Sequence, residues 1–250
     1  KRHGGSPRGR AGSLPPESAG RWSLTPTLPE ATTSTATARA HSLATTLLDR
    51  YGVVTRESVA AEGITGGFSA VYPVLKAMEE GGRIRRGYFV EGLGAAQFAL
   101  RGAVDRLRAE REVQDDPEVH VLAATDPANP YGAAVPWPRR DDQQRRSLQR
   151  AAGAFVVLVN GEPLLYLERG GRSVVTLPAF DGDHTSLAIA ALSTVAHDTA
   201  GRGLNIERID GEPAADSPHA QAFRAAGFAS GYRGLTYRAP REAFVGARGG

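Results

Sequence analysis

The chain has 250 residues, 41% of them apolar, which is enough for one large domain or two small ones with a buried core. It has no cysteine, which excludes disulfides and thiolate metal sites, and no apolar run approaches the 18 residues of a membrane-spanning helix. The pI of about 9.4 reflects mainly the first 26 residues, which hold five basic residues and one acidic residue, a net charge of +4. The whole chain has a net charge of +3, so residues 27–250 have a net charge of about −1 and are not basic.

Residues 1–38 are rich in Gly, Pro, Ser and Thr, with one aromatic anchor at Trp22. Such a composition offers too little apolar surface to offset chain entropy, so a flexible linker is expected here. A chain that opens on a linker is expected to be the C-terminal piece of a longer protein.

Residues 39–112 have the element order of a winged-helix domain. Apolar residues recur at helical spacing from Arg39 to Tyr51, and Thr55 is typical of the N-cap of a short second helix. A third helix is expected over residues 70–80, with its start close to Ser69 because proline at 73 is tolerated only near a first turn. Strands over 83–90 and 97–100 would form a two-stranded wing, followed by a helix over 103–112.

Residues 113–250 predict a second domain of the α+β class. Strands are expected over 119–124, 155–159, 164–168, 173–177, 204–209 and 228–238, with helices starting near Leu187 and Ser217. Asn160-Gly161 is a strong hairpin signal between two of these strands. We expect a small β-barrel or a curled antiparallel sheet with two covering helices.

Three arginines follow the double glycine that ends the third predicted helix. On a strand, Arg83 and Arg85 would share one face, while Arg86 and Tyr88 would share the other. Cations held on a rigid strand suit the phosphates of DNA, and a tyrosine suits stacking on a base or ribose. The alternative is a solvated wing with a core tyrosine.

Two further residues of this domain are weaker candidates for DNA contact. Ser69 at the start of the third helix could hold a phosphate, although simple N-capping is the more common role of serine there. Gln97 on the second wing strand could touch a base edge, or it is simply an exposed residue of an edge strand.

Three collinear blocks resemble the C-terminal region of the large helicase-related (Lhr) family of bacterial DNA helicases. They are GGRIRRGYFVEGLGAAQFAL at 81–100, VLAATDPANPYGAAVPWP at 121–138 and VLVNGEPLLYLERGGR at 157–172. Family members are ATP-dependent translocases of superfamily 2. Their C-terminal extension is similar to the winged-helix and β-barrel architecture of AlkZ-type DNA glycosylases. The resemblance therefore implies DNA as a partner, a role in DNA repair, and contacts with helicase and winged-helix modules upstream.

The motor of that family is missing from this chain. A P-loop needs lysine before serine or threonine, and the two lysines, Lys1 and Lys76, stand in no such motif. ATP and magnesium are therefore expected only for a motor domain absent here, and no cofactor for this chain. The six histidines show no metal-binding spacing. A cytoplasmic, nucleoid-associated location is expected.

The turn-rich block from 126 to 137 offers a second candidate site. Asp126 either holds an Asx turn or faces a pocket in which Tyr131 and Trp137 stack on a flipped base while the carboxylate activates water. The catalytic motif of AlkZ-type glycosylases has no counterpart here, so no catalytic role is transferred. A basic run follows, with Arg139, Arg140, Arg145, Arg146 and Arg150, and is either a solvated loop or a second phosphate-contacting patch.

These features leave three hypotheses of function. The favoured one is a noncatalytic DNA-binding and assembly region of an Lhr-type helicase. The second is a glycosylase-like base-excision module that uses the pocket near Asp126. The third is an oligomerisation scaffold, possible as a homo-oligomer, that does not itself contact DNA.

Overall fold

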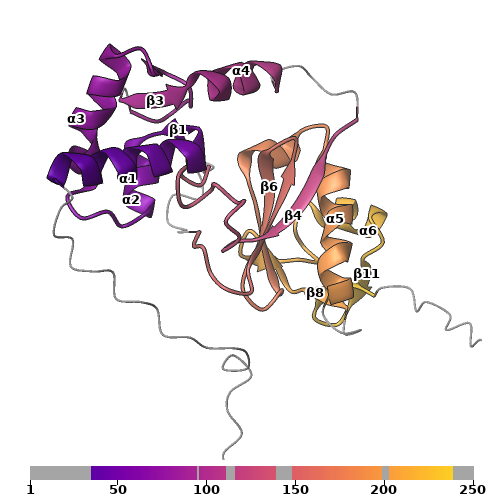
Figure 1. The fold of residues 1–250 in the computed structure, drawn as a ribbon. Coiled ribbons are helices and arrows are strands. Elements are labelled where there is room, and N and C mark those ends of the chain that lie inside the picture. Colours follow the sequence, from indigo (N-terminus) through magenta and orange to yellow (C-terminus); the bar gives the residue numbers. More distant parts are fainter. Residues whose placement is uncertain (1–34, 95, 111–115, 139–147, 199–202, 239–250) are drawn as a thin grey trace, which may run out of the picture.

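In the computed structural model the described residues are 35–94, 96–110, 116–138, 148–198 and 203–238. Of the linker expected over residues 1–38, residues 1–34 lie outside them and residues 36–38 belong to the first helix. The expected boundary at 112–113 also lies outside them. Figure 1 shows the elements of the first part, a winged-helix domain, in chain order. They are α1 (Ala36–Tyr51), β1 (Val53–Val54), α2 (Arg56–Ala61), α3 (Gly67–Glu80), β2 (Ile84–Gly87), β3 (Gln97–Leu100) and α4 (Arg101–Ala109).

Side-chain caps fix the starts of the first two helices; α1 begins at Ala36, before the expected Arg39, and α2 begins after Thr55 as predicted. Thr35 caps α1 by accepting from the amide of Ala38 at 3.1 Å, and Gly52, at φ 67°, ends it. Thr55 and Ser58 form a reciprocal capping box on α2, in which each side chain accepts from the other residue's amide.

The third helix starts earlier than expected. α3 begins at Gly67, after Gly66 in the left-handed region, so Pro73 lies inside the helix and not in its first turn. Because proline lacks an amide hydrogen, that turn gives up one backbone hydrogen bond. Ser69 is exposed in the first turn, and Gly66 occupies the N-cap position, so the expected N-cap role of Ser69 is wrong.

The wing is part of a three-stranded sheet of order β1-β3-β2, one strand more than expected. β3 is therefore the central strand and pairs with both neighbours in antiparallel fashion. Its Phe98 is fully buried and packs with Phe68 and Tyr72 of α3. This aromatic group joins the sheet to α3 and fixes the orientation of the wing.

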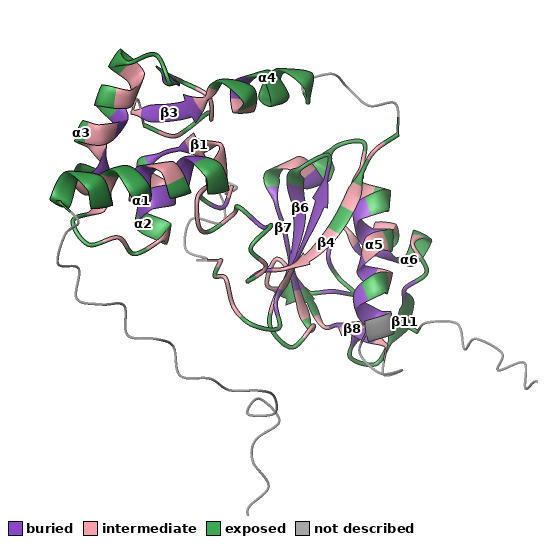
Figure 2. Cartoon of the chain, viewed as in Figure 1, coloured by how far each residue is buried: buried purple, intermediate pink, exposed green. Residues whose placement is uncertain are grey.

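The second part is built around a six-stranded sheet of order β10-β9-β7-β6-β5-β4. The strands are β4 (Val119–Ala123), β5 (Phe155–Val159), β6 (Glu162–Leu167), β7 (Ser173–Thr176), β9 (Arg208–Ile209) and β10 (Glu212–Pro213). The predicted hairpin is confirmed, since Asn160 and Gly161, both at positive φ, join β5 to β6. Figure 2 shows β6 and β7 as buried central strands and β4 as a half-buried edge.

This sheet is open, because β10 and β4 form two edges, so of the two expected forms the barrel is wrong. It is also not purely antiparallel, since β7 and β9 pair in parallel. The strand expected over 204–209 is broken at Glu207 into β8 (Leu204–Ile206) and β9, which belong to different sheets. β8 pairs with the hairpin β11 (Ala229–Gly231) and β12 (Gly234–Tyr237), where one strand was expected.

Two helices cover this core, as expected for the α+β class. α5 (Thr185–Asp198) follows the short 3-10 helix η3 (Pro178–Asp181) and packs on β4, β5 and β6, while α6 (Ala220–Ala225) packs on α5 and β12. The largest buried cluster joins Leu165, Ile189, Leu192 and Phe223. No helix of the described residues has the length and apolar character of a membrane span.

Candidate nucleic-acid interface

The three arginines after Gly82 are exposed on and beside β2. Arg83 directly precedes the strand and is exposed. Within the strand, Ile84 is buried, and Arg85 and Arg86 are exposed. Within the described part of the chain, no carboxylate lies within 4 Å of any of the three guanidinium groups. Their charges are therefore available to a ligand.

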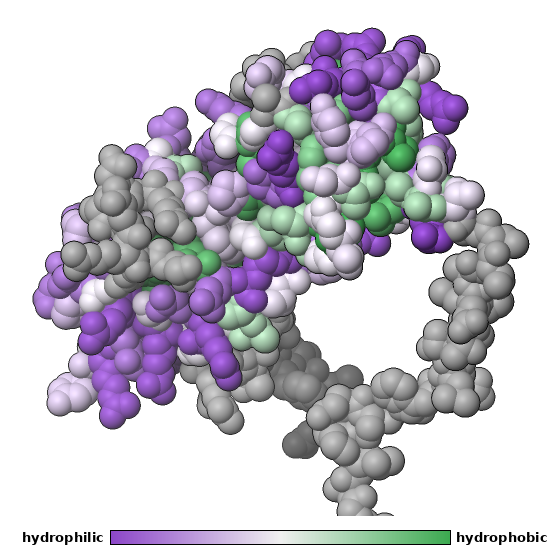
Figure 3. All heavy atoms as spheres, turned by 90° about the vertical axis from the view of Figure 1, so that its left-hand side faces the viewer, coloured by the Kyte–Doolittle hydropathy of each residue, from purple (hydrophilic) through white to green (hydrophobic). Residues whose placement is uncertain are grey.

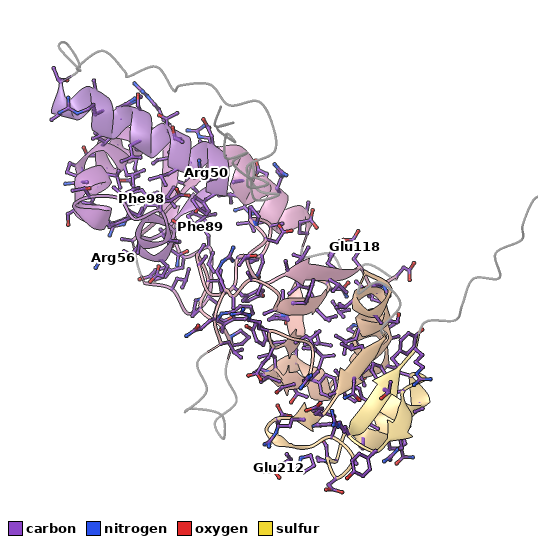
Figure 4. The ribbon with its side chains drawn as sticks, turned by 90° about the horizontal axis from the view of Figure 1, so that it is seen from below. Arg50, Arg56, Phe89, Phe98, Glu118 and Glu212 are labelled. Atoms are coloured by element: carbon purple, nitrogen blue, oxygen red, sulfur yellow. The ribbon has the colours of Figure 1, made fainter. Side chains whose placement is uncertain are left out.

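Arg86 is held by the sheet. It pairs across the ladder with Phe98, and its guanidinium carbon lies 5.9 Å from the centre of the Phe98 ring. A cation over an aromatic face is attracted by the ring quadrupole, which limits the rotamers of Arg86. Figure 4 shows Phe89 and Phe98 within the winged-helix domain.

Gln97 is buried and organises the segment after β2. Its Oε1 accepts from the amides of Phe89 at 2.8 Å and Val90 at 2.9 Å, while its Nε2 donates to the carbonyls of Val90 at 2.9 Å and Leu93 at 3.3 Å. The expected strand to residue 90 ends at Gly87 because these amides bond to a side chain and leave the ladder. Gln97 neither touches a base nor lies exposed on an edge, so both expected roles are wrong.

Tyr88, between β2 and the segment held by Gln97, is 80% exposed, which rules out the alternative of a core tyrosine. A hollow of about 730 Å³ adjoins it, between residues 88–93 and α4. Its wall includes Phe89 and Leu93 from the wing and Val104, Leu107 and Arg108 from α4. An exposed aromatic ring thus lies beside a partly apolar hollow.

Charge is divided unevenly within the winged-helix domain. Residues 36–82 hold four basic and five acidic side chains, a net charge of −1, whereas residues 83–110 hold six arginines and three acids, a net charge of +3. α3 itself carries Lys76 against Glu79 and Glu80, and Lys76 pairs with Glu80 at 3.6 Å. The positive field therefore belongs to the wing and α4, and not to α3.

The side of α3 that faces α1 is largely apolar. Pro73, Val74 and Ala77 line a groove of about 430 Å³ between α3 and α1. On the face shown in Figure 3, apolar side chains gather on the winged-helix domain with hydrophilic ones around them. Such a face suits contact with protein better than insertion between two phosphate backbones.

Sequence reasoning missed the arginines of α4. Arg101, Arg106 and Arg108 are exposed; Arg101 donates to the carbonyl of Gly82 at 2.8 Å, next to the wing arginines. The guanidinium of Arg108 lies 3.5 Å from the carboxylate of Asp105, and because both side chains are exposed this ion pair contributes little to stability. The sequence does show three arginines within residues 101–108. That Arg101 lies near Arg83 depends on the direction in which α4 leaves β3.

The loop around Asp126 is held from within. Asp126 accepts from the amide of Ala128 at 2.8 Å, which is the Asx turn expected as one of its two roles. Arg150 donates to the carbonyls of Asp126 at 2.9 Å, Thr125 at 3.3 Å and Tyr131 at 3.3 Å, and also to that of Asn129. Arg150 is therefore a structural clamp of this loop, while Arg139, Arg140, Arg145 and Arg146 lie outside the described residues.

Tyr131 and Trp137 stack on each other with ring centres 5.9 Å apart. Trp137 is only 8% exposed and packs edge-on against Tyr166, and Tyr131 donates to the carbonyl of Gly161 at 3.0 Å. Burial raises the pKa of the Tyr131 hydroxyl. Both rings thus belong to a small core, so a flipped base has no free face of Trp137 to stack on.

The fold and its charge define a winged-helix protein with a cationic wing, joined to an α+β domain. Residues 33–119 match the family described as "Large helicase-related protein, winged-helix domain". The chain is 46% identical over 236 residues to the "Lhr helicase/ probable uracil glycosylase" of Mycolicibacterium smegmatis, and 38% identical over 225 residues to the "Lhr helicase/uracil glycosylase" of Escherichia coli.

The resemblance found in the sequence is thereby confirmed, and the chain is a partial-length relative of the large helicase-related family. Each alignment covers 89% of this chain but only 15% and 14% of the two relatives. The helicase and glycosylase names belong to those much longer proteins.

Proposed function

We propose that this chain is a DNA-contacting region of an Lhr-type helicase, in which the wing arginines Arg83, Arg85 and Arg86 bind phosphates. The single observation that carries the proposal is the exposure of these three cations, free of carboxylate partners among the described residues, on and directly before a strand whose Ile84 is buried in the core. Phosphate contacts of this kind give affinity and position with little sequence specificity.

The family relationship supports a nucleic acid as the ligand, since both relatives carry the names helicase and uracil glycosylase. In the proposed protein the motor, with its ATP and magnesium, lies outside this chain. The groove between α1 and α3 is proposed to contact neighbouring modules of the parent protein, because its lining is mostly apolar, with Arg83 of the wing as its one arginine.

The test is equilibrium binding of the chain to a labelled DNA oligonucleotide. Replacing Arg83, Arg85 and Arg86 together by alanine should weaken binding by about 1 to 3 kcal/mol. The matched control replaces Arg169, Arg233 and Arg238, three exposed arginines of the second domain. Equal affinity of the wing variant and the control variant would refute the proposal.

The glycosylase alternative rests on the printed names of the relatives and gains no support from Asp126, whose carboxylate is engaged in its turn. It remains a proposal that release of uracil from a labelled oligonucleotide would test. The scaffold alternative predicts self-association in light scattering. It also predicts that the triple alanine variant of the wing binds DNA as tightly as the unmodified chain.

A further inference from the structure

We infer that the hollow between the wing and α4 is a binding site for an unpaired nucleobase, with Tyr88 as its stacking platform. This inference rests on the proposed function, since it assumes that the wing contacts DNA. It goes further in naming single-stranded DNA as the form bound at this site.

The charge of α3 does not suit insertion into the major groove. A helix that enters the major groove lies between two phosphate backbones and needs cations on its exposed face. The exposed residues of α3 are Ser69, Pro73, Lys76, Ala77 and Glu80, and the one cation among them is paired with Glu80. Groove reading by α3 is therefore disfavoured, and contact shifts to the wing and α4.

The lining of the hollow suits an unpaired base. Tyr88 is 80% and Leu107 is 41% exposed, and both are apolar surfaces that gain from being covered. The volume of about 730 Å³ lies within the usual range of small-molecule sites. In a duplex the faces of the bases are covered by their neighbours, so only an unpaired base can cover a tyrosine ring by stacking.

The arrangement of charge around the hollow suits a single strand. Arg86, which has no carboxylate within 4 Å among the described residues, lies two residues before Tyr88 and is available to a phosphate that flanks a stacked base. Arg108 lines the hollow with Asp105 3.5 Å from it, an exposed pair that a phosphate can replace. Glu91 also lines the hollow and repels phosphate there. Glu91 beside Arg108 and Arg86 tolerates a single strand more readily than the two backbones of a duplex.

The backbone on both sides of Tyr88 is held in place. Gln97 fixes the amides of Phe89 and Val90, directly after Tyr88. The ring of Phe89 packs closely on Gly87, only 3.0 Å from where a side chain at that position would place its Cβ. The tyrosine therefore stands on a backbone that is ordered before DNA arrives. Less conformational freedom is lost when a base stacks on such a platform.

The experiment compares single-stranded and duplex oligonucleotides of equal length, with 2-aminopurine in the single strand as a reporter of stacking. Tyr88→Ala should weaken binding of the single strand roughly tenfold and reduce quenching of the 2-aminopurine, with duplex affinity unchanged. Tyr88→Trp should retain both affinity and quenching. Circular dichroism checks the fold, which an 80% exposed side chain should not affect.

Equal loss on both DNA forms, no loss on either, or failure of tryptophan to substitute would overturn the inference. The wing triple variant separates this from failure of the proposed function. If that variant loses affinity while Tyr88→Ala does not, only the base site is refuted. If neither variant changes DNA binding, both proposals are refuted.

Discussion

The side chain of Gln97 bonds to the backbone of Val90 in both directions, accepting from its amide and donating to its carbonyl, each at 2.9 Å. A primary amide presents the same donor and acceptor pair as a neighbouring strand. Gln97 thus continues the ladder with its side chain for the residues beyond Gly87, and the wing keeps its shape without further strand pairing.

Replacing Gln97 by methionine should lower the free energy of unfolding by at least about 2 kcal/mol, because two amides and two carbonyls lose their partner inside the domain. Urea unfolding of the two proteins measures the difference. Gln221→Met, at an exposed position of α6, is the control and should be close to neutral. Similar stability of both variants would show that Gln97 does not hold the wing.

Arg150→Lys should destabilise the second domain by about 1.5 to 3 kcal/mol. A lysine ammonium cannot reproduce the planar group with which Arg150 reaches the carbonyls of Thr125, Asp126, Asn129 and Tyr131. Chemical denaturation followed by circular dichroism gives the value. Arg169→Lys, at an exposed site, should leave stability unchanged; an equal effect of the two changes would contradict the clamp.

Asp126 is expected to act through its turn and not through its charge. Asp126→Asn keeps an oxygen that accepts from the amide of Ala128, so stability should not change, whereas Asp126→Ala should cost about 1 kcal/mol. Any uracil release by the chain should survive in Asp126→Asn. Selective loss of that activity in a stably folded asparagine variant would instead place catalysis at Asp126.

Glu62 should make the winged-helix domain sensitive to acid. Its Oε1 accepts from Tyr51 and pairs with Arg50, each at 2.6 Å, and these bonds, that of Tyr51 first, lower the pKa of Glu62 below its ordinary 4.5. A carboxylate with a lowered folded-state pKa gives its full stabilisation above the unfolded value and loses it as the pH falls through the folded one.

The stability of the domain should therefore decline as the pH drops below about 4.5, and Glu62→Gln should decline less over that range. Thermal unfolding at a series of pH values measures both profiles. Glu57→Gln, on α2, is the matched control. Parallel profiles of Glu62→Gln and the unmodified chain would show that the contacts of Glu62 with Arg50 and Tyr51 do not contribute to stability.

Local signals predicted most of the elements. Thr55 as an N-cap and Asn160-Gly161 as a hairpin turn act through their own backbone, so short-range reasoning found them. Strand alternation placed Arg83 and Arg85 on one face and Arg86 on the other, but it did not predict that Arg86 is exposed although Ile84, two residues earlier, is buried. These features depend on few residues, all close in sequence.

Features that depend on distant partners were not predictable from the sequence. Gln97 is buried because the segment after β2 lies against it and bonds to its amide through Phe89, Val90 and Leu93, whereas the sequence shows only a glutamine on a predicted strand. Arg150 lies in a basic run, but its partners are about 20 residues earlier in the chain. The sequence did not decide between a barrel and an open curled sheet, and it did not predict the parallel pairing of β7 with β9, because both depend on contacts between strands more than 30 residues apart.

The dependence of DNA affinity on salt tests the central claim most directly. Each phosphate neutralised contributes about 0.9 to the slope of log affinity against log salt on a duplex, and about 0.7 on a single strand. The account predicts that replacing Arg83, Arg85 and Arg86 by alanine flattens the slope by up to about three phosphate equivalents, while the triple variant of Arg169, Arg233 and Arg238 keeps the original slope. A wing variant with an unchanged slope would contradict the account.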